Sequence, residues 1–250
     1  MSYCSAPHPA LSIVVPLYNE EENIPFLVKA IFSSLSADAN LLELVLVDDG
    51  SEDGTADLVI ELSVAEPRIR LVRHERNRGL GAAIRTGLNA ARGDLILYTD
   101  ADLPFDFTLI PQLLALAGEN NIVIGYRATR GDGLRRWLLS LGYNLIFSTV
   151  FGLHVRDVNF ACKLIPRRAL RGMRLDSEGS FIDAELLLEC RRQGFAITEF
   201  PLTYYPRTRG LSTLSRPRVI VGILSEMLKY ARRPLRNNHE LIEEVDYKRG

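Results

Sequence analysis

Two carboxylates one residue apart, Asp100 and Asp102, directly follow a short apolar run, Leu95–Tyr98. A run of four apolar residues between Gly93 and polar residues has the length of a buried strand. In an extended chain the side chains of residues i and i+2 point to the same side, so these carboxylates could share one divalent cation. Such a cation could in turn hold a diphosphate. Two acids one residue apart recur by chance in a chain with 31 acidic residues. The interpretation therefore depends on where this pair lies in the predicted fold.

Four apolar runs, each followed by a segment with helical spacing, place the carboxylate pair in a larger pattern. The predicted strands are Leu11–Leu17, Leu42–Val47, Ile69–Arg73 and Leu95–Tyr98. Strands that alternate with helices favour an α/β fold with a doubly wound, mostly parallel sheet and helices on both faces. Such sheets bind their ligands at the carboxyl ends of the strands. The loops that leave these ends therefore hold the candidate ligand-binding residues.

Each of the three earlier loops has two interpretations. Tyr18–Asn23 carries asparagines and glutamates, which either cap the next helix or bind a ligand. Asp48 and Asp49 either form a turn or accept hydrogen bonds from a nucleobase or ribose. Gly79 precedes an alanine-rich helix, where a residue without a side chain permits close backbone approach. The glycine spacing around it matches neither phosphate-binding glycine pattern, so the phosphate signal is weak.

The chain changes character after a further predicted strand, Ile122–Gly125. The polar, basic and glycine-containing segment Tyr126–Gly133 is predicted to be a loop on the ligand side. Large apolar residues dominate 135–153, which indicates either a buried helix or an interfacial helix with Trp137 at the boundary. A last amphipathic helix, Val219–Tyr230, is flanked by basic residues.

Between these two helices, Val155–Ile165 and Ala196–Phe200 are predicted to add strands to the sheet. Asp183 lies in the first turn of a predicted helix that stops near Gly194, and an acid in that position favours the helix dipole in any protein. An aromatic and basic loop, Tyr204–Ser212, follows the second of the two strands.

Composition bounds the possibilities further. The 250 residues suffice for one large domain or two small ones, and the formal charge of −1 gives no basic field for nucleic acid. The three cysteines are distant from one another and odd in number, which indicates free thiols in a reducing compartment. We find no signal peptide and no apolar run of about 18 residues that would span a membrane. No pattern indicates an oligomeric state.

Four ordered motifs carry a family resemblance: Ser-Ile-Val-Val-Pro-Leu-Tyr-Asn-Glu-Glu, Val-Asp-Asp-Gly-Ser-x-Asp-Gly-Thr, Asn-Arg-Gly-Leu-Gly-Ala-Ala and Tyr-Thr-Asp-Ala-Asp-Leu-Pro. Together they resemble family 2 of the glycosyltransferases, and within it the dolichyl-phosphate mannosyltransferase-like enzymes, which include polyprenyl-phosphate glucosyltransferases. The resemblance runs from about Leu11 to Ser212. It implies a GT-A fold, and we expect a single domain over 1–235, with a nucleotide-sugar half at 11–125, an acceptor-side half at 126–235 and a polar tail at 236–250.

The resemblance also implies residue roles. Asp100 and Asp102 would bind Mg²⁺ or Mn²⁺ and the donor diphosphate, and Asp48 or Asp49 would contact base or ribose. The remaining expected substrate-binding residues are, on the donor side, Pro16, Tyr18, Asn19, Glu20 and Gly79, and, around phosphate, Arg127, Arg207, Arg209 and Ser212. Arginines suit phosphate because a guanidinium makes two parallel hydrogen bonds to its oxygens.

The expected reaction is inverting transfer of a hexose from GDP-mannose or a UDP-sugar to a polyprenyl phosphate. Asp102 and Arg127 would act on the reacting phosphates. An acceptor phosphate is already anionic, so it needs no strong base, whereas a sugar-hydroxyl acceptor would require one, with Asp183 as the candidate. We expect a cytoplasmic protein bound peripherally to a membrane.

A third possibility is a catalytically silent subunit that binds nucleotide sugar. It is motivated by the altered segment Asn159–Lys163, where Ala161 replaces a usual glycine of the subgroup and Cys162 a usual aromatic residue. A separate departure, Thr213 after Ser212 where lysine is common, also concerns the acceptor side.

Overall fold

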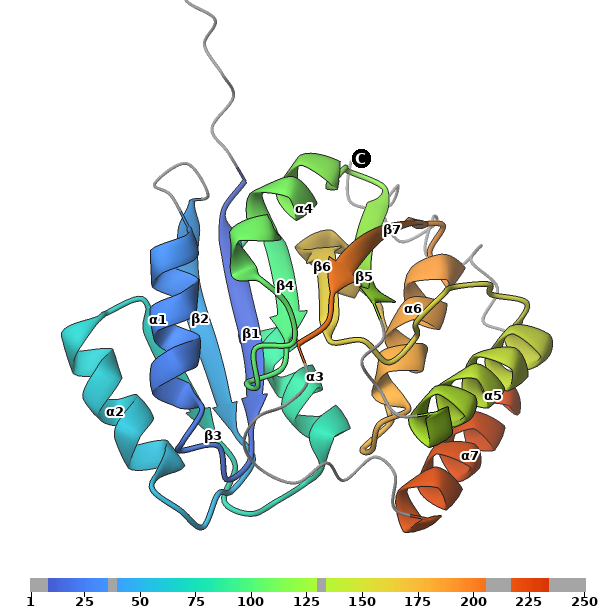
Figure 1. The fold of residues 1–250 in the computed structure, drawn as a ribbon, viewed down its shortest axis with the longest axis horizontal. Coiled ribbons are helices and arrows are strands. Elements are labelled where there is room, and N and C mark those ends of the chain that lie inside the picture. The colour runs from blue at the N-terminus through green and yellow to red at the C-terminus, as the bar shows by residue number, and fades with distance from the viewer. Residues whose placement is uncertain (1–8, 36–39, 130–133, 206–216, 234–250) are drawn as a thin grey trace, which may run out of the picture.

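The computed structural model describes residues 9–35, 40–129, 134–205 and 217–233. The described strands form one sheet in the order β3-β2-β1-β4-β6-β5-β7 (Figure 1). Their bounds are β1 Leu11–Leu17, β2 Leu41–Asp48, β3 Ile69–Arg73, β4 Leu95–Thr99, β5 Asn121–Thr129, β6 Cys162–Pro166 and β7 Ala196–Thr203.

All described strand pairs are parallel except those of β6, which runs antiparallel to both of its neighbours. Tyr98 of β4 pairs with Lys163 of β6, and Ile124 of β5 pairs with the same lysine from the other side. The predicted mostly parallel sheet is thus confirmed. Because β6 is reversed, the residues that precede it lie at the edge where the parallel strands end.

Helices cover both faces of the sheet, as predicted. The described helices are α1 Ile24–Ser34, α2 Thr55–Ala65, α3 Leu80–Ala90, α4 Ile110–Leu116, α5 Leu134–Phe151, α6 Ile182–Arg192 and α7 Pro217–Ala231, with short 3₁₀ turns at η2 Phe107–Leu109 and η3 Arg167–Leu170. In Figure 1, α1 and α4 lie in front of the sheet, and α5 and α7 lie side by side at one end.

Two apolar cores result, one on each face, because successive residues of a strand point to opposite sides. Ile13 and Val15 of β1 pack with α1, α2 and α4, whereas Val14 packs with α3 and α6. The central strands are buried on both faces and therefore read as continuous apolar runs rather than alternating ones.

Two local predictions were wrong, and one of the two interpretations of the Tyr18–Asn23 loop, helix capping, is not supported at Asn23. Tyr126–Thr129 does not begin a loop but continues β5, which pairs with β7 as far as Thr203. The segment that begins at Val155 becomes a strand only at Cys162. Asn23 stands at the N-cap of α1 without a side-chain capping bond, because its amide donates instead to Glu20 Oε2 at 2.5 Å. Pairing with β7 overrides the local preference of Tyr126–Thr129, whereas at Asn23 a local bond to Glu20 takes the place of the capping bond.

Candidate active site

The loops after β1 and β2 interlock at the carboxyl edge of the sheet. The Asn19 N–H donates to Ser51 Oγ at 2.9 Å, and the Glu52 N–H donates to Asn19 Oδ1 at 2.9 Å. Asn19 has φ +54, in the left-handed region that asparagine tolerates better than most residues. The Glu20 N–H adds a bond to Thr55 Oγ1 at 2.9 Å. The two loops therefore form one unit.

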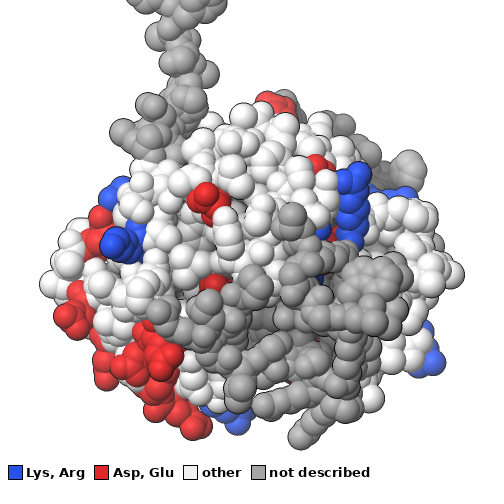
Figure 2. All heavy atoms as spheres, in the orientation of Figure 1, with Lys and Arg blue, Asp and Glu red and all other residues white. Residues whose placement is uncertain are grey.

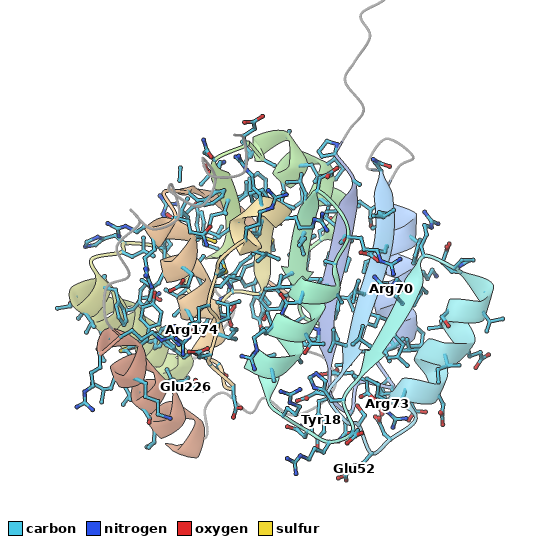
Figure 3. The ribbon with its side chains drawn as sticks, turned by 180° about the vertical axis from the view of Figure 1, so that it is seen from behind. Tyr18, Glu52, Arg70, Arg73, Arg174 and Glu226 are labelled. Carbon is cyan, nitrogen blue, oxygen red and sulfur yellow. The ribbon has the colours of Figure 1, made fainter. Side chains whose placement is uncertain are left out.

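This unit presents an aromatic ring and a negative surface. Tyr18 is 43% exposed and lies with Glu52 at the same edge of the sheet (Figure 3), and Pro16 is half-buried in β1 beneath it. Acidic side chains gather over these loops (Figure 2), where Glu21, Glu22, Glu52 and Asp53 are exposed. An anionic ligand at this edge would therefore need a compensating cation.

Asp48 and Asp49 lie behind this surface and are both buried. Asp48 accepts the Ser51 N–H at 2.9 Å and forms an ion pair with Arg73 Nε at 3.0 Å. Asp49 Oδ1 accepts from His74 Nδ1 at 2.7 Å and from a backbone N–H in the β3–α3 loop at 2.9 Å. These carboxylates therefore organise the loops that follow β2 and β3, and their predicted contact with base or ribose stays a prediction.

Gly79 lies where another part of the chain comes too close for a side chain. It has φ +96, and its N–H donates to Asp49 Oδ2 at 2.8 Å. A Cβ on Gly79 would lie 2.4 Å from the Glu178 carbonyl oxygen, and one on Gly81 would lie 2.2 Å from that of Ser177. The backbone group that approaches these glycines is the chain's own segment at 177–178, and the predicted contact of Gly79 with a substrate stays a prediction.

Asp100 and Asp102 follow β4 at the centre of the edge. Ala101 between them is buried while both aspartates are partly exposed, as expected for side chains that point to the same accessible side. Asp100 Oδ1 lies 3.4 Å from the Tyr98 hydroxyl. Leu103 follows with φ +51, a costly conformation for a branched residue that its surroundings must hold in place.

The described residues contain no group of three or more histidine, cysteine or acidic side chains that could cage a metal ion. A pair of partly exposed carboxylates nevertheless fits a cation that keeps several waters and takes oxygens from a bound phosphate, which is how Mg²⁺ commonly binds. The donor set of Asp100 and Asp102 therefore suits a hard divalent ion that is completed by its substrate.

A buried ion pair lies beneath this carboxylate pair. Lys163 Nζ lies 2.5 Å from Asp183 Oδ1, and the two side chains are 1% and 6% exposed. Lys163 Nζ also donates to the Phe160 carbonyl at 2.9 Å and lies 5.5 Å from the centre of the Tyr98 ring. Burial raises the pKa of Asp183, and Lys163 opposes that rise. Asp183 therefore has a lysine partner, and its predicted role as a base stays a prediction.

Arg127 also has a buried carboxylate as its partner. Its Nε and one terminal nitrogen donate to the two oxygens of the buried Asp157 at 2.7 and 3.1 Å. Its guanidinium also lies 5.2 Å from the centre of the Tyr204 ring and 5.7 Å from that of Phe160. The geometry gives Arg127 a structural partner, and its predicted contact with phosphate stays a prediction. Arg207, Arg209 and Ser212 lie outside the described residues.

Sequence reasoning gave no role to two groups that shape the site. His74 bridges Asp49 and Thr86 Oγ1, at 2.7 and 3.0 Å, and so joins β2 to α3. Lys163 lies within the segment Val155–Ile165, which was predicted only to add a strand. The one available signal was a lysine flanked by apolar residues, Cys162 and Leu164, because a lysine in a buried strand requires a charged partner.

Comparison with known proteins agrees with this geometry. The sequence description of glycosyl transferase family 2 matches residues 12–173. The chain belongs to glycosyl transferase family 2. As a member it is similar to glycosyltransferase AglD of Haloferax volcanii, with 30% identity over 231 residues, 88% of this chain and 36% of AglD. It is also 33% identical over 219 residues to an undecaprenyl-phosphate 4-deoxy-4-formamido-L-arabinose transferase of Salmonella choleraesuis, 86% of this chain and 66% of that protein. The chain thus spans about a third and just under two thirds of these relatives.

Two solved structures of another glycosyltransferase share the fold. Glucosyl-3-phosphoglycerate synthase of Mycobacterium tuberculosis, solved with uridine diphosphate, aligns with a TM-score of 0.66 at 25% identity over 87% of this chain and 79% of that one. The same enzyme solved with Mn²⁺, uridine diphosphate and phosphoglyceric acid aligns with a TM-score of 0.70 at 23% identity, over 90% and 80% of the two chains. The mostly parallel sheet of this chain is therefore of the GT-A type, as predicted.

Proposed function

We propose that this family 2 glycosyltransferase moves a sugar from a nucleotide-sugar donor, GDP-mannose or a UDP-sugar, to a polyprenyl phosphate. The observation that carries the proposal is the placement of Asp100 and Asp102 at the centre of the sheet edge, beside the interlocked loops of Tyr18 and Asn19. The names of two similar proteins support the donor and the acceptor. One relative is named as an undecaprenyl-phosphate sugar transferase, and one structural neighbour was solved with uridine diphosphate.

In the proposed reaction an acceptor phosphate oxygen attacks the anomeric carbon as the bond to the nucleoside diphosphate breaks, which inverts the configuration. Asp100 and Asp102 would hold Mg²⁺ or Mn²⁺, which when bound neutralises the charge that develops on the leaving diphosphate. The donor-side loops orient the nucleoside, with Tyr18 offering an exposed ring at the edge. The exposed acids of these loops add to the need for a cation beside an anionic donor.

The environment of Asp183 favours a phosphate acceptor over a sugar hydroxyl. A general base must reach the proton that it removes, but Asp183 is buried and its Oδ1 is bound to Lys163. An acceptor phosphate is already deprotonated near neutral pH and requires no such base. Transfer to a hydroxyl remains the competing proposal, and it requires Asp183 to leave Lys163.

We further propose that the protein binds a membrane surface peripherally, on the cytoplasmic side, through α5 and α7. Apolar side chains on the outer faces of the two helices are exposed: Leu145, Ile146 and Val150 of α5, and Val221, Leu224 and Leu228 of α7. Lys229 and Arg232 lie at the end of α7, where cations would attract anionic lipid. Within the described part of the chain, no helix has the length and apolarity needed to cross a bilayer.

Transfer of label from GDP-mannose and from UDP-sugars to undecaprenyl phosphate, with and without Mn²⁺, tests the activity. Asp102→Asn should lower turnover at least about 100-fold, in the range seen when a charge-stabilising group is removed. Asp106→Asn is a matched control, because this nearby aspartate only caps a 3₁₀ turn. Tight nucleotide-sugar binding without turnover of any donor would favour the silent subunit instead.

Flotation with anionic vesicles tests the membrane contact. The variant V221S/L224S/L228S should float less than the wild type, and the bound fraction should fall as salt rises. A wild-type protein that stays wholly in the soluble fraction at low salt would refute this part of the proposal.

A further inference from the structure

Segment 174–181, which precedes α6, lies between α7 and the glycine turn at Gly79–Gly81. From α7, Glu226 Oε1 accepts the N–H of Glu178 at 3.0 Å and of Gly179 at 2.9 Å. Figure 3 places Glu226 on α7, away from the sheet edge where Tyr18 lies. One carboxylate oxygen of α7 thus fixes two consecutive backbone amides of the segment.

The same residue of the segment contacts the glycine turn. The Glu178 carbonyl accepts the Gly81 N–H at 2.8 Å. The contact is backbone against backbone, since a Cβ on Gly79 or Gly81 would lie within 2.4 Å of a carbonyl oxygen of the segment. Packed atoms this close transmit a displacement rather than absorb it.

From the glycine turn the contacts continue to the donor edge. The Gly79 N–H donates to Asp49 Oδ2 at 2.8 Å, and Asp49 directly follows Asp48 at the end of β2. The loop that starts there interlocks with Asn19, next to the exposed Tyr18. A continuous series of hydrogen bonds and covalent links therefore joins α7 to the proposed nucleoside pocket.

A second anchor holds the other half of the segment. Glu185 of α6 is fully buried and accepts the N–H of Asp176 at 3.0 Å and of Ser177 at 2.8 Å. Arg233 pairs with Glu185 at 2.7 Å and with Asp176 at 3.1 Å. Loss of the Glu226 contact would therefore release 178–179 and leave 176–177 in place.

We infer that Glu226 is a positioning residue for the donor-binding edge, which it serves by holding segment 177–179 against the Gly79–Gly81 turn and so fixing the position of Asp49. This inference rests on the proposed function only in taking the edge at Tyr18 to bind the nucleotide. Glu226 touches no reacting atom, and it belongs to the helix whose outer face we propose for the lipid surface. A change in the packing of α7 would therefore change the position of the donor-binding residues as well.

The test compares Glu226→Ala and Glu226→Gln with the control Tyr230→Phe in the full chain. Tyr230 also joins α7 to α6, because its hydroxyl donates to Glu189 Oε1 at 2.8 Å. Among the described residues this hydroxyl makes no hydrogen bond to 177–179. Hydrogen exchange of the amides at 79–81 should be at least about tenfold faster in Glu226→Ala than in the wild type, which corresponds to the loss of about one charge-assisted hydrogen bond. Glu226→Gln keeps an acceptor oxygen and should recover most of the protection, and Tyr230→Phe should leave it unchanged.

Calorimetric titration with UDP and with GDP, each with Mn²⁺, gives the functional measurement. Glu226→Ala should raise the Kd of the nucleotide that binds by about fivefold or more, at a Tm similar to that of Tyr230→Phe. Unchanged exchange at 79–81 in Glu226→Ala, or equal acceleration in Tyr230→Phe, would overturn the inference. A wild type that binds neither nucleotide would instead count against the proposed function, and the exchange data would still decide whether Glu226 holds the turn.

Discussion

Replacement of Lys163 by methionine should produce a large and pH-dependent loss of stability. The pair of Lys163 and Asp183 is almost wholly buried, with Nζ and Oδ1 2.5 Å apart. Removal of one partner of a buried ion pair costs about 3–5 kcal/mol, because the remaining charge has no compensation. For a chain of this size, about 2–4 °C of Tm accompany each kcal/mol, so we expect a Tm about 6–20 °C lower near pH 8.

The pH dependence follows from the pKa of Asp183. Burial raises this pKa, so the folded protein holds the proton more tightly than the unfolded chain, and this contribution to stability is lost as the pH rises through the folded pKa. Lys163 acts against the rise, so its removal raises the pKa of Asp183 further. The destabilisation by Lys163→Met should therefore be smaller at pH 5 than at pH 8.

Urea unfolding followed by circular dichroism at both pH values measures the effect. The double variant Lys163→Met with Asp183→Asn removes both charges and should recover much of the loss. Arg68→Met is the control, because its pair with Glu66 is exposed and should contribute less than about 1 kcal/mol. A loss below about 1 kcal/mol for Lys163→Met at pH 8, or an equal loss at pH 5, would refute the reasoning.

Two further predictions concern packing and burial. Gly81→Ala should lower the free energy of unfolding by about 1–3 kcal/mol, because the new methyl would meet the Ser177 carbonyl at 2.2 Å, whereas Gly222→Ala has open space on α7 and should raise it by about 0.5–1 kcal/mol. Equal effects of the two variants in urea unfolding would contradict this explanation. Burial raises the pKa of Cys162 and Cys190 to about 12, so iodoacetamide at pH 8 should label neither in the native protein and both in urea. Peptide mass mapping makes the measurement, and rapid native labelling of either thiol would show that its burial is not maintained in solution.

The apolar periodicity predicted the first half of the sheet well. Leu11–Leu17 and Ile69–Arg73 were placed to the residue, because each dense run ends where the polar loop begins. The same reasoning ended β5 too early at Gly125. Tyr126 and Arg127 are polar, and their strand geometry comes from pairing with β7, which lies some 75 residues along the chain.

The sequence located the candidate carboxylates of the sheet edge, but it did not predict the bonding partners of the residues around them. Asp100 and Asp102 could be located because a carboxylate pair after a buried strand is a local pattern. The bonds of Asp49 depend on His74 and Gly79, whose distance from it in space cannot be derived from their spacing in sequence. Likewise, nothing local to Lys163 indicates that its partner is Asp183, because the pairing arises from the reversal of β6.

The reversal of β6 also has a consequence for how such a chain can change. Residues that follow parallel strands build the proposed donor side, whereas residues that precede β6, from Arg156 to Ala161, reach the same edge from the opposite direction. Where the structure describes it, the connection between β5 and β6 contains α5 and no strand of the sheet. Insertions there would alter the surface that we propose for the acceptor and leave the strand order and the loops after β1 and β2 as they are. Acceptor specificity can therefore be redesigned without a change in the loops that we propose for the donor.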